Sequence, residues 1–151
     1  MGKRIMAALV GGLLVGTLDI FVACAISQVP PDVVLHFIAA GLIGRDAAFH
    51  GGMPTVALGV ALQEFISVVA AGVYVAASTR LPTLLRNPIP WGLAYGAAVN
   101  IVLTFGVQPL SYVARTHPIV WPGILENLAA NMVLFGVPIA LIARSFLRDE
   151  A

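Results

Sequence analysis

Charged residues are scarce in this chain, at 10% of the total against roughly 25% in an ordinary soluble domain. That shortage excludes a soluble domain of ordinary composition. Hydrophobic residues instead make up 60% of the chain, and its mean hydropathy is +0.97. This composition predicts a membrane protein whose principal partner is the lipid bilayer.

Several kinds of site are excluded by what the chain lacks. Its one cysteine, Cys24, rules out an internal disulfide and a cysteine-based metal cluster. His36, His50 and His117 have no tight ligand spacing and fall outside the long apolar runs, so we expect no metal site and no haem. The net charge of +1, without a Lys/Arg cluster, indicates no nucleic-acid partner. The sequence contains no phosphate-binding loop, zinc-protease spacing or catalytic triad, so we expect no cofactor and no enzymatic activity.

Four apolar runs are long enough, at about 20 residues each, to cross a hydrocarbon core of about 30 Å. They cover approximately residues 5–26, 54–77, 89–112 and 119–143. The short connection between the second and third runs makes them antiparallel neighbours. The sequence therefore predicts an all-α, polytopic membrane protein, with residues 1–151 forming a single four-helix transmembrane domain of two helical hairpins.

Basic residues are unevenly shared between the two ends of these runs. One end has Lys3, Arg4, Arg80, Arg86, Arg144 and Arg148, and the other has only Arg45 and Arg115. The positive-inside rule places the richer side in the cytoplasm. We therefore expect a multi-pass protein of the bacterial inner membrane with both termini cytoplasmic.

A short apolar segment over residues 33–43 separates the first two runs. It follows two prolines and Asp32, which we expect to be the N-cap, and it precedes Gly44, a typical helix stop. Eleven residues cannot cross a membrane as a helix. We expect a short helix on the periplasmic side, either lying in the interface or re-entering the bundle.

The third run has hydrogen-bonding and small residues at every fourth position. Gly92, Gly96, Asn100, Thr104 and Gln108 fall along one ridge of a continuous helix. Two glycines allow another backbone to approach closely, and the polar side chains continue the same line. This pattern predicts a central helix that is contacted along its whole length.

The first run also combines close packing with a carboxylate. Gly12, Gly16 and Asp19 share one helix face, so we expect the packing surface and the acid to coincide. From this we predict that Asp19 points at the third spanning helix, near Asn100.

Three ionisable residues fall inside the spanning runs, where a central charge costs about 2.5–3.5 kcal/mol on insertion scales. Counted from the periplasmic ends, Asp19 and Glu64 lie roughly 10–15 Å deep and Glu126 about 10 Å deep. Amide side chains occupy the same half of the bilayer. We predict a polar vestibule that opens to the periplasm above a tightly packed apolar floor. Its ligand-binding or protonatable residues are Asp19, Gln63, Glu64, Asn100, Glu126, Asn127 and Asn131, and the packing glycines are Gly12, Gly16, Gly92 and Gly96.

Two interpretations of these polar residues stay open. Asn100, Asn127 and Gln108 are typical of interhelical hydrogen bonds that only hold helices together. For Asp19 and Glu64 a functional role is favoured, because no Lys or Arg occurs at their depth to neutralise them.

The segment 88–148 contains short motifs of a known family. The run from Trp91 to Gly96, the Gln108-Pro109-Leu110 step and the Glu126-Asn127 pair resemble the YagU-like family of small bacterial inner-membrane proteins. The resemblance implies a suggested link to acid resistance, and it assigns no catalytic residues. This chain departs from the family in its compact first periplasmic loop.

Three functions are compatible with these observations. The leading one is a binding or sensing protein that takes a proton, cation or small polar solute from the periplasm, with a role in envelope or acid stress. The second is a small solute or ion transporter acting as a homo-oligomer, which requires water to reach the apolar floor. The third is an accessory subunit of a larger membrane complex, which requires a partner on a lipid-facing stripe of small residues.

Overall fold

The computed structural model describes residues 2–107 and 121–148, and all the regular secondary structure in those ranges is helical. This confirms the all-α class. Four helical stretches are long and apolar enough to cross a membrane: Gly2–Ser27, Met53–Arg80, Pro88–Val107 and Leu125–Leu147. The elements are α1 (Gly2–Ser27), α2 (Pro31–Ile43), α3 (Arg45–His50), α4 (Met53–Arg80), α5 (Thr83–Arg86), α6 (Pro88–Ile101), η1 (Val102–Val107), α8 (Trp121–Ala130), η3 (Asn131–Gly136) and α9 (Val137–Leu147).

The segment between the first two spanning helices contains two helices. α2 begins at Pro31, with Pro30 as its N-cap, so Asp32 lies in the first turn and the expectation that it caps the helix was wrong. The reason is that the fixed φ of proline suits the first helical position. Gly44 ends α2 with a positive φ of 86° and is followed directly by α3, which the sequence pattern did not predict.

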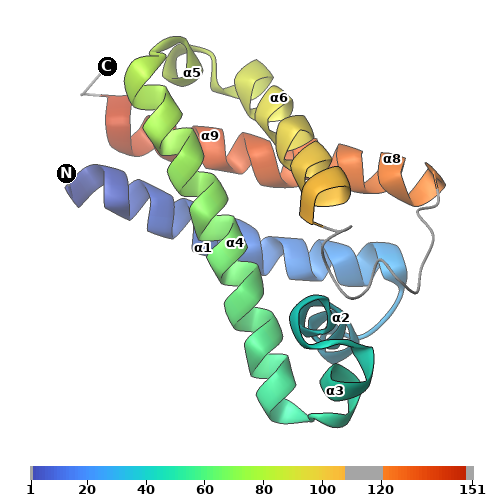
Figure 1. The fold of residues 1–151 in the computed structure, drawn as a ribbon. Helices are drawn as coiled ribbons and strands as arrows, with labels where there is room; N and C mark the ends of the chain where they lie inside the picture. The colour runs from blue at the N-terminus through green and yellow to red at the C-terminus, as the bar shows by residue number, and fades with distance from the viewer. Residues whose placement is uncertain (1, 108–120, 149–151) are drawn as a thin grey trace.

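α4 and α6 cross α1 and α9, whereas α1 and α9 run alongside each other (Figure 1). α1 packs against α4 and α9, while α6 packs against η3 and α9. α5 connects α4 to α6 at the end where α1 begins and α9 finishes, and α2 and α3 lie at the opposite end of α1 (Figure 1).

The main apolar core lies at the end of the molecule near α5. Tyr74 and Tyr95 pack edge to face there, with ring centroids 5.1 Å apart. The Tyr74 hydroxyl donates to the carbonyl of Leu84 at 3.1 Å, and that of Tyr95 donates to the carbonyl of Ala70 at 2.5 Å. These bonds tie α5 and α6 to α4. The buried cluster contains Ala7, Val15, Ala71, Tyr74, Val75, Leu84, Leu85, Phe135, Ile139, Ala140, Ala143 and Leu147.

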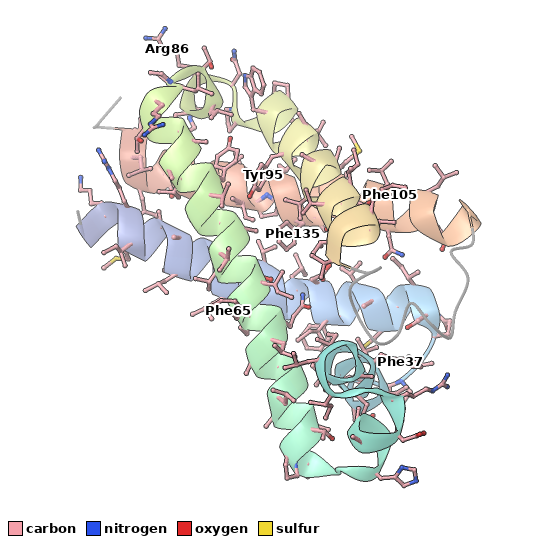
Figure 2. The ribbon with its side chains drawn as sticks, in the orientation of Figure 1. Phe37, Phe65, Arg86, Tyr95, Phe105 and Phe135 are labelled. Carbon is pink, nitrogen blue, oxygen red and sulfur yellow. The ribbon has the colours of Figure 1, made fainter. Side chains whose placement is uncertain are left out.

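Large apolar side chains also cover the outside of the bundle. Phe65 of α4 is 67% exposed and Phe105 of η1 is 58% exposed. Figure 2 shows Phe65 pointing away from the other helices, whereas Tyr95 and Phe135 lie between helices. An apolar exterior is what a bilayer requires and what water disfavours.

α6 and η3 approach each other closely at three glycines. A side chain at Gly96 would collide with the carbonyl of Asn131, and one at Gly136 would collide with the carbonyl of Gly92. η3 is a π-helix, and so is η1, into which α6 continues. The ridge of every fourth residue is buried at Gly92, Gly96 and Asn100 and half-buried at Thr104, which lies in η1. Residues 108–120, including Gln108, lie outside the described ranges.

Candidate functional site

The polar residues of α1 and α4 meet where these two helices cross. Gln63 donates from Nε2 to Oδ2 of Asp19 at 2.8 Å. One residue further along α4, Oε1 of Glu64 accepts a hydrogen bond from the Thr17 hydroxyl at 2.9 Å. Because Thr17 and Asp19 are only two residues apart on α1, adjacent residues of α4 can reach both of them. Two side-chain hydrogen bonds therefore join the helices at one level.

Gly16 creates the space into which Glu64 fits. A Cβ atom at Gly16 would lie 2.6 Å from Oε2 of Glu64 and 3.0 Å from Oγ of Ser67. Both oxygen atoms are buried, and neither has a hydrogen-bond partner within the described ranges. Ser67 is 0% exposed. Two oxygen atoms without hydrogen-bond partners thus lie against the same glycine. Burying them in this state costs free energy, which a bound ligand would offset.

Ser67 differs from the other serines in the described part of the chain. Ser27, Ser78 and Ser145 each donate to a carbonyl three or four residues earlier in their own helix. That local bond is the usual way in which a helical serine satisfies its hydroxyl inside a membrane. Ser67 makes no such bond, although it is the most deeply buried of the four.

No basic side chain is available along the sequence near the two carboxyl groups. Neither Lys nor Arg occurs between Arg4 and Arg45, or between Arg45 and Arg80. Asp19 and Glu64 both lie near the middle of these intervals and are half-buried. Neither α1 nor α4 therefore supplies a nearby basic residue of its own to neutralise Asp19 or Glu64.

Two of the predicted amide residues, Asn100 and Asn131, are buried on α6 and η3. Asn100 of α6 is 5% exposed and Asn131 at the start of η3 is 9% exposed. Asn131 donates from Nδ2 to the main-chain carbonyl of Asn127 at 2.9 Å. Glu126 and Asn127 are exposed on α8.

The prediction that Asp19 points at the third spanning helix near Asn100 was wrong. Asp19 faces α4, because the glycine face of α1 packs on α4. The seven predicted site residues therefore fall into an α1/α4 group (Asp19, Gln63 and Glu64), an α6/η3 group (Asn100 and Asn131) and two exposed residues (Glu126 and Asn127).

Sequence reasoning missed Thr17 and Ser67 as members of the site. A weak signal was present for both, since Ser67 lies three residues after Glu64 and so shares its helix face. Thr17 follows Gly16 directly. Hydroxyl residues are common in membrane helices, so this spacing alone does not distinguish a ligand-binding serine from one that bonds to its own helix.

The described histidines take part in local bonds. Nδ1 of His36 lies 2.6 Å from the carbonyl of Asp32, and Nδ1 of His50 lies 2.8 Å from that of Asp46. Among the residues that the structure describes, no three His, Cys, Asp or Glu side chains are grouped to hold a metal ion. His117 lies outside those ranges.

No protein-family model, curated protein or solved structure matches this chain. The function therefore has to be argued from the chemistry of the α1/α4 site. The resemblance to the YagU-like family stays a prediction.

The Asp19–Gln63 hydrogen bond allows a matched test of its contribution. Asp19→Ala leaves the Gln63 amide without its acceptor and should lower the free energy of unfolding by about 1–2 kcal/mol. Asp19→Asn keeps an acceptor oxygen and should cost less than about 0.5 kcal/mol. SDS-driven unfolding in mixed micelles, followed by circular dichroism, measures both. Equal losses in the two variants would show that the bond contributes nothing measurable.

Proposed function

We propose that this chain is a protein of the bacterial inner membrane that binds a proton or a small cation at the α1/α4 site. The observation that supports this most directly is Oε2 of Glu64, a buried carboxyl oxygen without a hydrogen-bond donor. Ser67 Oγ lies beside it, also buried and also without a partner. Asp19, fixed by Gln63, contributes a second carboxyl group at the same level.

The charges at the site favour a positively charged ligand over a neutral solute. A neutral solute could donate a hydrogen bond to Glu64, but the negative charge of the carboxylate would remain uncompensated in a low-dielectric setting. A proton or a monovalent cation removes that charge. Among the three ligands that the sequence predicts, the small polar solute is therefore the least favoured.

The distribution of basic residues supports an orientation for this proposal. Lys3, Arg4, Arg80, Arg86 and Arg144 occur on helix ends at the α5 side of the molecule, and Arg86 is visible there in Figure 2. With this end in the cytoplasm, α2 and α3 lie on the periplasmic side. α2 packs its backbone at Leu35 against Gly59 of α4, a contact that fits both an interfacial and a re-entrant helix.

A sensing role follows from this placement. The main apolar core lies between the site and the α5 end, so the ligand would enter from the periplasmic side. A carboxyl group whose occupancy follows the external proton or cation concentration would report on envelope or acid stress, which is also what the YagU-like resemblance implies.

Infrared difference spectroscopy tests the proposal on protein in lipid nanodiscs. We expect the carbonyl stretching band of a protonated carboxyl in an apolar environment to change with pH in the wild type, and this change to be lost in Glu64→Gln. Glu126→Gln is the matched control, because it removes an exposed carboxyl group of the same type and should keep the band. Identical pH-dependent spectra for wild type and Glu64→Gln, together with no cation-dependent change, would reject the proposed function.

A further inference from the structure

We infer that His36 makes the packing of α3 on α2 sensitive to acid, so that protonation of its ring releases α3 from α2. This inference goes beyond the proposed function, because it concerns the α2/α3 end of the molecule and uses no residue of the α1/α4 site. In the orientation proposed above, that end lies on the periplasmic side.

The hydrogen bond of His36 fixes which ring nitrogen carries the proton. Nδ1 lies 2.6 Å from the main-chain carbonyl oxygen of Asp32. A carbonyl oxygen can only accept, so Nδ1 carries the hydrogen and donates it. In the neutral ring Nε2 is then an acceptor, and it is buried without a hydrogen-bond partner among the described residues. A second proton would turn Nε2 into a buried, charged donor without an acceptor, which costs more than a buried neutral acceptor does.

The same ring packs against the side chain through which α3 contacts α2. His36 stacks on Phe49 of α3, with ring centroids 5.3 Å apart and an interplanar angle of 25°. Phe37 packs edge to face on Phe49, at a centroid distance of 5.0 Å. α3 has only six residues, too few for a helix that is stable on its own, so it depends on such contacts. A rotation of His36 that exposes Nε2 to water would break the stack on Phe49.

The charges around His36 oppose a second cation. The Arg45 guanidinium lies 5.8 Å from the centroid of the Phe49 ring and 5.5 Å from that of Phe37. Arg45 thus already lies over the ring on which a charged His36 would have to stack, and the two like charges would repel each other. The other ionisable groups on α2, on α3 and on the adjoining halves of α1 and α4 are Asp32, Asp46, His50, Asp19, Cys24 and Glu64, and none of them bonds to Nε2.

The neutral ring is therefore compatible with α3 packed on α2, and the protonated ring is not. Histidine is the side chain that ordinarily changes its charge between about pH 5 and 8. The packing should accordingly be complete at the upper end of this range and be lost as the pH falls.

Hydrogen–deuterium exchange of the full chain in lipid nanodiscs tests this at the amide of Ala48, which donates to the carbonyl of Gly44 at 3.0 Å. In the wild type its protection, corrected for the intrinsic pH dependence of exchange, should be about tenfold lower at about pH 5 than at about pH 7.5, equal to about 1.4 kcal/mol of opening free energy. His36→Gln keeps a donor for the Asp32 carbonyl, and His36→Phe keeps a ring against Phe49. Neither variant can be protonated, so neither should show the response.

His50→Gln is the matched control. His50 makes the same bond to the carbonyl four residues earlier, but it is exposed on α3. This variant should keep the response of the wild type.

Three outcomes would overturn the inference. The first is equal protection of Ala48 at the two pH values in the wild type. The second is a response that persists in both His36→Gln and His36→Phe. The third is loss of the response in Glu64→Gln, which would assign it to the α1/α4 site and leave the proposed function intact.

Discussion

Gly96→Ala should lower the free energy of unfolding by about 3 kcal/mol or more, at the upper end of what overpacking usually costs. The added Cβ atom would lie 2.6 Å from the Cα atom of Met132 and would collide with the carbonyl of Asn131. Both neighbours are main-chain atoms, which cannot rotate away as a side chain would. α6 and η3 would have to separate, and the contact made by Gly92 and Gly136 would open with them.

Gly72→Ala is the matched control for this substitution. Gly72 lies within the spanning helix α4, and a Cβ atom there would meet no atom within 4 Å. Its effect should be neutral or stabilising by up to about 1 kcal/mol, because alanine has the higher helix propensity. Unfolding in SDS, followed by circular dichroism, compares the two variants. A Gly96→Ala protein as stable as Gly72→Ala would contradict the close approach of α6 and η3.

Gly12→Ala should destabilise the crossing of α1 and α4 by about 2–3 kcal/mol. The new methyl group would lie 2.7 Å from the main-chain nitrogen of Val68 and would overlap its Cα atom. Because the obstacle is again backbone, α1 must shift along or away from α4. The Thr17–Glu64 and Asp19–Gln63 hydrogen bonds lie one to two turns further along and would be stretched by this movement.

Gly11→Ala provides a control at the neighbouring position. A Cβ atom at Gly11 would make only ordinary contacts, 3.5 Å from Cγ2 of Ile142 and 3.8 Å from Cβ of Ala71. We expect its stability to stay within about 0.5 kcal/mol of the wild type. The same SDS unfolding experiment applies. Equal stability of the Gly11→Ala and Gly12→Ala proteins would show that the crossing is looser than described.

The contacts of Gly12 and Gly16 with α4 also explain why the polar residues of the α1/α4 site lie where they do. Gly12 brings the backbones of α1 and α4 together. Gly16 lacks a side chain, so the oxygen atoms of Glu64 and Ser67 can pack against it. The packing glycines and the unpartnered oxygen atoms therefore belong to one structural unit. A substitution at Gly12 that separates α1 from α4 should therefore also weaken the binding of a ligand at the α1/α4 site.

The all-α class and the number of helices long and apolar enough to cross a membrane could be predicted from the sequence alone. Scarcity of charge excludes a soluble domain, and apolar runs of about 20 residues match the thickness of a bilayer. The sequence also singles out Asp19 and Glu64, because it offers no Lys or Arg at their depth. These properties depend on composition and on position along one helix, which a linear sequence records directly.

The partners of each polar residue were decided only by the tertiary structure. Asp19 bonds to Gln63 of α4, and the Glu64 and Ser67 oxygens of α4 pack against Gly16 of α1. The helix that carries the ridge becomes π-helical at Val102. A helix face is set by local periodicity, but the neighbour that it meets depends on crossing angles and on the backbone contacts that glycines permit. Those contacts join residues far apart in the chain, so no local pattern specifies them.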